Sequence, residues 1–259
     1  MNFLFNTTQD PKKSMATKIC MEELPQILID KKFNVTKNDW ENYDKYDVVI
    51  FIPYDADIKN AKLKNKNIKV GIADPKLTNS KEKNIAIEAD FLLVSSIEQY
   101  DKFLKYNNNI YIYYMFPEVN LNLKKHIEKK KIILGYHGNK VHLHCSYPHL
   151  TIALDNLAEI YDIELWVIYN IETLGIWTYG VPKNIKVKHI QWSETIYDEV
   201  FDKIDIGIVP NFINNDFKDS FFSNKKLFLK DKEDYILQYK YSSNPGRQYI
   251  FAMKGIPMV

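Results

Sequence analysis

The stretch Ile132-Ile-Leu-Gly135-Tyr-His137-Gly138-Asn-Lys140 restarts an alternation of apolar strands and helices that has already run once through the chain. A short apolar run that ends in glycines predicts a buried strand followed by a tight turn. We therefore expect a second α/β unit to begin near Ile132. Its further strands are expected at 163–168, 185–190, 206–209 and 256–259, and its helices at 150–161, 193–203 and 246–254.

The first half of the chain carries the same alternation. Its apolar segments are continuous rather than alternating, which is typical of a parallel sheet buried on both faces. The expected strands are 3–5, 48–52, 68–72, 91–94 and 110–115, and the expected helices are 15–31, 57–64, 81–89 and 97–106. The sequence thus predicts an α/β fold of two doubly wound Rossmann-like domains facing each other across a cleft.

A charged, poorly apolar segment, 121–131, separates the two series and is interpreted as a connector. We place the domain boundary inside it, giving an N-terminal domain at 1–125 and a C-terminal domain at 126–259. The second domain ends inside or directly after an apolar strand, so we expect it to be incomplete at that end, as in a C-terminally truncated chain.

Composition narrows the classes of function. The 259 residues are 46% hydrophobic and carry a net charge of +2, which excludes a disordered chain and a strongly basic nucleic-acid binder. No apolar run approaches the ~20 residues that span a bilayer, and the N-terminus has no secretory signal. Two distant cysteines, Cys20 and Cys145, imply no disulfide framework and fit a reducing cytosol. We expect a cytoplasmic protein that binds no nucleic acid.

The densest basic patch lies in the first half of the chain and consists of Lys59, Lys62, Lys64, Lys66 and Lys69. A lysine run is usually a solvated face. The alternative interpretation is attraction to an anionic surface, which would hold the protein peripherally on the inner face of a membrane.

Arg247 is the only arginine among 35 basic side chains of Lys and Arg. Its planar fork of donors matches phosphate and carboxylate oxygens two at a time, which lysine does not. A Pro-Gly turn places Arg247 at the start of the helix expected at 246–254, where the helix dipole favours an anion. We expect its guanidinium near Gly135–Gly138 and Lys240, free to meet a diphosphate. The alternative is a structural pair with a carboxylate.

The glycine turn itself is a candidate phosphate site. Gly135 and Gly138 allow a backbone to approach a phosphate closely, and Lys140 supplies charge. An ordinary glycine turn is the alternative. His137 and His144 are candidates for a general base or a substrate-orienting group.

The histidines near this turn also raise the question of zinc. We expect His142 and His144 to share one face of an extended segment. Together with Cys145 and His149 they are the residue types that bind zinc, but the chain has no matching Cys or His pair elsewhere. We therefore expect no metal site.

Polar residues follow several of the expected strands. In open α/β sheets, ligands bind at the carboxyl ends of strands. This position selects Asp74, Ser95, Pro210 and Asn211. The alternative for each is a turn or helix-cap residue, since Asp and Ser are favoured there.

Two C-terminal segments resemble GT-B glycosyltransferases of the glycosyl transferase group 1 type. Asp205-Ile-Gly-Ile-Val-Pro210 is similar to their aspartate–strand–proline segment, and 240–259 is similar to their donor-site helix and following strand. Segments 89–96 and 135–138 are similar to the last N-domain strand and to the glycine loop of the donor domain.

The resemblance implies a nucleotide-sugar donor bound by the C-terminal half and a bacterial surface glycan or glycolipid acceptor bound by the N-terminal half. It implies no metal and no cofactor other than the nucleotide-sugar co-substrate. The resemblance implies that Arg247 contacts the diphosphate, and the residues expected to bind the donor are Gly135, Gly138, Lys140, Pro210, Asn211, Lys240, Ser243, Asn244 and Arg247. Catalysis is assigned to His137 and Asp74, and the acceptor to Ser95 and His144.

The chain departs from the family at two positions. Ile250 and Ser242 stand where retaining members carry glutamates. Two alternatives therefore stay open: a non-catalytic descendant that binds a sugar nucleotide or a partner protein, and a nucleotide-sugar epimerase or phosphorylase of similar architecture.

Overall fold

The computed structural model describes residues 1–77, 79–117, 122–193, 195–210 and 246–259. Their contacts divide into two units, a first unit of residues 1–117 and a second unit of residues 122–210 and 246–259. The domains 1–125 and 126–259 stay a prediction, because a contact grouping does not test where a domain folds on its own.

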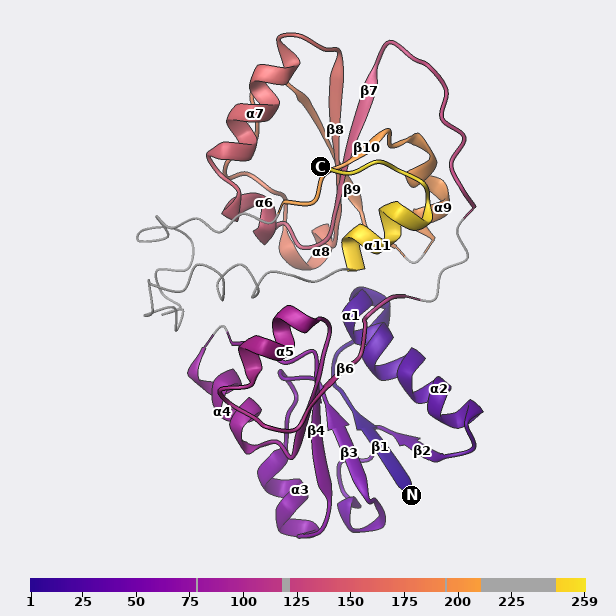
Figure 1. Ribbon diagram of the computed structural model, residues 1–259, viewed down its shortest axis with the longest axis vertical. Coiled ribbons are helices and arrows are strands. Elements are labelled where there is room, and N and C mark those ends of the chain that lie inside the picture. Colours follow the sequence, from indigo (N-terminus) through magenta and orange to yellow (C-terminus); the bar gives the residue numbers. More distant parts are fainter. Residues whose placement is uncertain (78, 118–121, 194, 211–245) are drawn as a thin grey trace. The chain divides into compact units, whose positions relative to one another are not determined.

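The first unit contains a six-stranded, entirely parallel sheet (Figure 1). The strand order is β2-β1-β3-β4-β5-β6. The strands are β1 (Asn2–Asn6), β2 (Asn34–Lys37), β3 (Val48–Phe51), β4 (Lys69–Ala73), β5 (Phe91–Val94) and β6 (Ile110–Ile112). The helices are η1 (Pro11–Lys13), α1 (Met15–Lys18), η2 (Ile19–Glu23), α2 (Leu24–Asp30), η3 (Tyr43–Lys45), α3 (Ile58–Lys64), α4 (Ser80–Glu88) and α5 (Ile97–Phe103).

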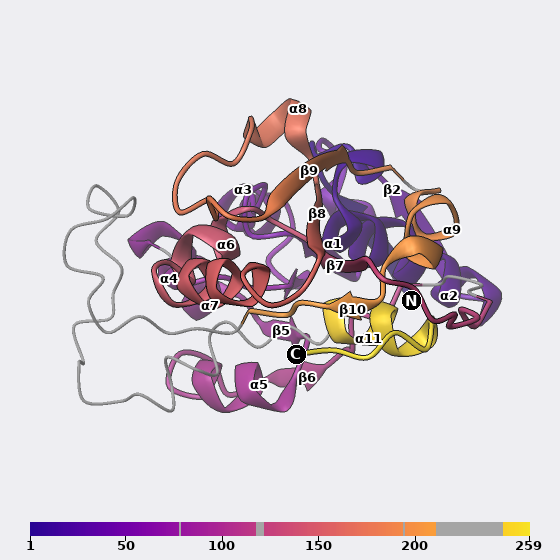
Figure 2. The ribbon, with the colours of Figure 1, turned by 90° about the horizontal axis from the view of Figure 1, so that it is seen from above.

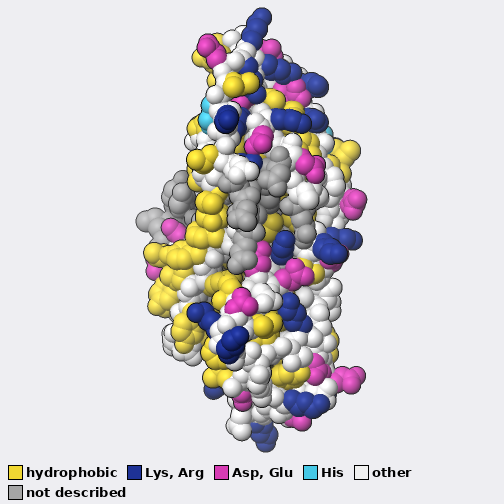
Figure 3. All heavy atoms as spheres, turned by 90° about the vertical axis from the view of Figure 1, so that its right-hand side faces the viewer, with side chains coloured by type: hydrophobic (Ala, Val, Ile, Leu, Met, Phe, Trp, Pro, Cys, Tyr) yellow, Lys and Arg dark blue, Asp and Glu magenta, His cyan; other side chains and the backbone are white. Residues whose placement is uncertain are grey.

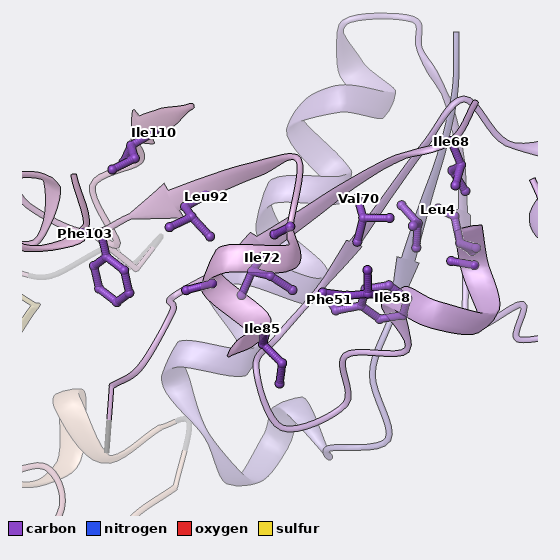
Figure 4. Packing of buried hydrophobic residues seen from close by; sticks show 14 of the residues in the cluster. Leu4, Phe51, Ile58, Ile68, Val70, Ile72, Ile85, Leu92, Phe103 and Ile110 are labelled. Atoms are coloured by element: carbon purple, nitrogen blue, oxygen red, sulfur yellow. The ribbon is translucent and has the colours of Figure 1, made fainter. Parts of the chain in front are cut away.

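Helices cover both faces of this sheet. On one face, Leu4, Phe51 and Val70 pack with side chains of α3, α4 and α5, as Figure 4 shows for Ile58, Ile85 and Phe103. On the other face, Phe5 and Ile50 pack with the helical segment 15–30. Both faces are buried because consecutive strand residues point to opposite sides. The predicted strand–helix alternation of the first half is confirmed.

Strand β2 was not predicted. It reads Asn34-Val-Thr-Lys37 and is mostly exposed, so it lacks the apolar run by which the other strands were found. It is an edge strand that pairs only with β1, and its backbone hydrogen bonds do not depend on apolar side chains.

The second unit contains a four-stranded parallel sheet in the order β10-β7-β8-β9. The strands are β7 (Ile132–His137), β8 (Ile163–Tyr169), β9 (Lys186–Gln191) and β10 (Ile206–Gly207). The helices are α6 (Val141–Cys145), α7 (His149–Ala158), α8 (Ile171–Leu174), α9 (Ile196–Glu199), η4 (Phe201–Lys203) and α11 (Gly246–Met253). Two parallel sheets with helices between their strands confirm the predicted α/β class.

Both faces of the second sheet are also covered (Figure 2). Leu143 of α6 and Leu154 of α7 pack on one face with Leu165 and Val167 of β8. Phe201 of η4 and Phe251 of α11 pack together beside His137, with the two phenylalanine ring centroids 5.5 Å apart. The carboxyl end of β7 therefore meets α11.

Three local predictions in the second unit are wrong. Residues 141–145 form the helix α6, so His142 and His144 do not lie on an extended segment. The helix predicted at 193–203 shrinks to α9 and η4. The strand predicted at 256–259 forms only an isolated parallel bridge between Met258 and Gly207. Short segments offer too few residues for a period to distinguish helix from strand.

Replacing Gly207 by alanine is expected to destabilise the second unit by about 1–3 kcal/mol, the usual cost of overpacking a core. A Cβ at Gly207 would lie 2.6 Å from Cδ2 of Phe251, whose side chain is fully buried. Urea unfolding measures the loss. The double variant Gly207→Ala/Phe251→Leu is the control, because it removes the ring that the new methyl meets, so it should lose less than the sum of the single variants. A single variant as stable as the wild type would contradict this packing.

Candidate anion-binding site

Gly138 lies directly after β7 and brings the chain close to Arg247. Its φ of +128° is a conformation that favours glycine. A Cβ at Gly138 would lie 3.1 Å from Cδ of Arg247 and 3.2 Å from the hydroxyl of Tyr136. The glycine therefore admits the arginine side chain to the carboxyl end of β7, where ligands of parallel sheets bind.

Arg247 is the second residue of α11 and is buried, with 9% of its surface exposed. Its guanidinium carbon lies 5.9 Å from the ring centroid of Tyr136. Within the described part of the chain, Nη1 is buried without a hydrogen-bond partner and no carboxylate pairs with the side chain. We expected the guanidinium to be open to a ligand. The structure instead buries the arginine side chain, with Tyr136 beside the guanidinium and Gly138 beside Cδ.

A buried guanidinium nitrogen without an acceptor is costly, so the position favours a bound anion. The positive end of the α11 dipole lies at the same place. The arginine fork and the helix start together suit a phosphate or a carboxylate.

The ring of Tyr136 lies beside the guanidinium. Its hydroxyl donates to the Asn139 carbonyl at 2.5 Å. Burial raises the pKa of Tyr136 to about 12, while the Arg247 charge acts in the opposite direction. The phenol is therefore neutral at ordinary pH and supplies a ring face for the cation. Sequence reasoning missed Tyr136, since no pattern in the sequence tells which strand residue meets a helix more than a hundred positions away.

His137 is the last residue of β7 and is buried, with 6% of its surface exposed. Its Nε2 lies 3.2 Å from the Arg247 carbonyl oxygen. Burial lowers the pKa of His137 to about 3, so the ring is neutral at ordinary pH. A general base must contact the proton it removes, and this burial does not favour that role.

The other predicted donor residues of the second unit make contacts away from Arg247 or lie outside the described residues. Lys140 Nζ donates to the carbonyls of Gly175 and Ile176 at 3.1 and 3.2 Å, which ties down the turn after α8. Gly135 lies inside β7, where a Cβ would come within 2.5 Å of the Ile204 side chain, so close packing explains it. Pro210 is buried and is the last residue of the described range 195–210. Asn211, Lys240, Ser243 and Asn244 lie outside the described residues.

His144, a predicted acceptor residue, lies on α6 in the second unit. Its ring packs edge-on against Tyr179, with the centroids 6.0 Å apart. Burial and the charge of Lys140 lower the pKa of His144. Of the predicted site residues, the structure brings Gly138, His137 and Arg247 together. His144 packs elsewhere, against Tyr179.

Asp74 and Ser95 belong to the first unit. Asp74 follows β4 with a φ of +50° and is buried. Its Oδ2 accepts from Lys76 Nζ at 2.6 Å, whereas Oδ1 is buried and has no hydrogen bond among the described residues. Ser95 is fully buried, and both its backbone N and its Oγ donate to Oε1 of Gln99 at 2.9 Å. Of these two, Asp74 has an oxygen left to accept a proton or a hydroxyl.

Among the described residues, no three side chains of His, Cys, Asp or Glu are grouped so as to hold a metal ion. No described helix combines the length and the apolar character that a bilayer crossing needs. On the face shown in Figure 3, acidic and basic side chains are interspersed.

Comparison with known proteins gives fold-level similarity at low identity. No family model and no curated protein matches the chain. An alpha-glucosyltransferase in complex with UDP-glucose and DNA containing an abasic site is similar over 83% of this chain and 73% of its own, with 13% identity and a TM-score of 0.49. The lipopolysaccharide outer core galactosyltransferase WaaB in its apo form is similar over 80% and 73%, with 12% identity and a TM-score of 0.46. The S. aureus MnaA–UDP structure is similar over 80% and 73%, with 12% identity and a TM-score of 0.44.

Proposed function

We propose that the second unit binds the diphosphate of a nucleotide sugar and that the protein is a metal-independent glycosyltransferase. The observation that carries the proposal is the buried Nη1 of Arg247, unpartnered among the described residues, at the start of α11 and beside Gly138. The resemblance of 205–210 and 240–259 to donor-site segments supplies the nature of the anion.

In the proposed reaction, the bond between the anomeric carbon and the diphosphate oxygen breaks, and its electron pair leaves with the nucleoside diphosphate. An acceptor hydroxyl oxygen forms the new bond to the anomeric carbon. Arg247 stabilises the negative charge that develops on the leaving diphosphate, as fixed cations do at such positions. Lys140, Lys240, Ser243, Asn244, Asn211 and Pro210 remain proposed donor contacts.

Asp74 is the proposed base for the acceptor hydroxyl. The Oδ1 atom has a lone pair that no described donor uses, and the Lys76 ammonium holds Oδ2 at 2.6 Å. A carboxylate that is oriented through one oxygen, and that has no described hydrogen bond on the other, keeps a lone pair for the hydroxyl proton. Ser95 and His144 remain proposed acceptor contacts, and the acceptor is proposed to be a bacterial surface polysaccharide or glycolipid. The proposed location is the cytoplasm, with peripheral contact on the inner face of the membrane.

A second candidate is a protein that binds a sugar nucleotide without transferring the sugar. The observation that favours it is Ile250, which stands at a family glutamate position and is buried, with 1% of its surface exposed. An apolar side chain facing the core offers no hydrogen bond to a ribose.

Titration calorimetry with UDP, GDP and ADP sugars, in the presence of EDTA, tests the binding. We expect at least one nucleotide sugar to bind, and we expect slow hydrolysis of that donor in the absence of acceptor. Binding without hydrolysis or transfer would favour the second candidate. Failure of every nucleotide sugar to bind at millimolar concentration would contradict both.

A further inference from the structure

The inference concerns His137 and rests on the proposed function. We propose that His137 is a positioning residue that fixes the start of α11, and with it Arg247, against the carboxyl end of β7. Its role is therefore to orient the anion-binding arginine, in place of the base role that the sequence predicted for it.

The imidazole holds α11 at two points. Its Nε2 lies 3.2 Å from the carbonyl oxygen of Arg247, in the first turn of the helix. Its ring packs edge-on against Phe251, one turn further along α11, with the centroids 5.0 Å apart and the planes at 78°. The same ring packs edge-on against Phe201 of η4 at 5.2 Å.

The hydrogen bond defines the state of the ring. A carbonyl oxygen only accepts, so Nε2 must carry the hydrogen. The Arg247 guanidinium is the charged group that faces the imidazole from α11, and it opposes a second positive charge there. A neutral ring protonated on Nε2 is the state that serves as a fixed donor over the ordinary pH range.

The position of the arginine follows from this contact. Gly138, next to His137 in the chain, lies against Cδ of Arg247, and Tyr136, on its other side, lies against the guanidinium. Three consecutive residues at the end of β7 thus contact one arginine, through its carbonyl, its side-chain stem and its charged group. Of these three contacts, the one made by His137 is to the backbone from which the side chain extends.

His137→Phe and His137→Gln separate the hydrogen bond from the packing. Phenylalanine keeps an aromatic ring between Phe201 and Phe251 but donates no hydrogen bond, whereas glutamine keeps an amide donor. A neutral hydrogen bond contributes about 0.5–1.5 kcal/mol, so we expect His137→Phe to bind UDP about two- to tenfold more weakly. We expect His137→Gln to recover part of that loss.

The chain also permits a test that needs no ligand. Because Arg247 is its only arginine, one Nε–H signal in a ¹H–¹⁵N NMR spectrum reports on this side chain. We expect that signal to shift in His137→Phe and to move back in His137→Gln. We also expect the ring nitrogens of His137 in the wild type to show hydrogen on Nε2 and no titration between pH 5 and pH 8.

The outcomes distinguish this inference from the proposed function. An unchanged arginine signal in His137→Phe, or a His137 ring that titrates near pH 6.5, would overturn the positioning role even if UDP binds. If the arginine signal shifts as expected but the wild type binds no nucleotide, the contact stands and the proposed function fails. If UDP binds equally to the wild type and to His137→Phe, the proposed function stands and the positioning role fails.

Discussion

We expect Arg247→Lys to lower the proposed affinity for a nucleoside diphosphate by about ten- to a hundredfold. The variant keeps the positive charge but loses the two-pronged donor geometry, and a hydrogen bond to a charged group contributes about 1.5–3 kcal/mol. The guanidinium is buried beside Tyr136 and Gly138, where water screens it poorly, so the loss should be large for a single side chain. Calorimetric titration with UDP measures it.

Thermal melting of the same variant separates binding from folding. No described carboxylate pairs with Arg247, so the exchange should leave no buried acidic group behind and the melting temperature should change little. Lys186→Gln is the matched control, since it removes one positive charge from the same unit at a side chain that is 74% exposed. It should bind UDP as the wild type does. A large drop in the melting temperature of Arg247→Lys with unchanged affinity would make the arginine part of the scaffold.

The parts of the fold that were predicted correctly are those that bury apolar runs. Strands β3, β4, β5 and β8 read as continuous apolar segments because helices cover both faces of their sheets. The segments that were missed or misassigned obtain their structure from neighbours. β2 is held by the backbone of β1, and the segment 256–259 pairs with Gly207 through Gly207 N and Pro257 O at 2.8 Å. Neither depends on a local pattern of side chains.

The candidate site was predictable only in part. The Pro-Gly turn correctly placed Arg247 at the start of a helix. The burial of the guanidinium and the packing of His137 between Phe201 and Phe251 were not predictable, because they depend on which strand end α11 crosses. The same limit applied to the charged segment 121–131, because its sequence did not indicate which side chains its lysines would bind. Within the second unit, Lys124 and Lys129 bind the carboxylate of Asp205, the residue directly before the strand predicted at 206–209.

Asp205→Ala is expected to destabilise the second unit by at most about 3–5 kcal/mol, the cost of removing one partner of a fully buried ion pair, because the Asp205 side chain is itself 18% exposed. The Asp205 carboxylate binds Lys124 Nζ at 2.9 Å and Lys129 Nζ at 2.7 Å, and it accepts from Ile133 N at 2.8 Å. The Lys124 side chain is 4% exposed, and its ammonium also donates to the Ile204 carbonyl. Without the Asp205 carboxylate, the buried ammonium of Lys124 keeps one described acceptor, the Ile204 carbonyl oxygen. Urea unfolding followed by tryptophan fluorescence reports mainly on this unit, because Trp166, Trp177 and Trp192 belong to it and only Trp40 does not.

The stabilisation by Asp205 should also depend on pH in a defined direction. Burial acts to raise the pKa of Asp205, but the hydrogen bond from Ile133 N and the ammonium groups of Lys129 and Lys124 outweigh it and hold the pKa below its ordinary value of 3.8. A carboxyl group whose pKa is lower in the folded state stabilises that state above the unfolded pKa and loses this effect as the pH falls through the folded pKa. The difference in unfolding free energy between the wild type and Asp205→Ala should therefore be full at pH 7 and should shrink below about pH 4. Asp205→Asn keeps an acceptor for Ile133 N without the charge, so it should lose less than Asp205→Ala and show the same trend. An equal difference at pH 7 and pH 3 would mean that the charge of Asp205 does not stabilise the second unit.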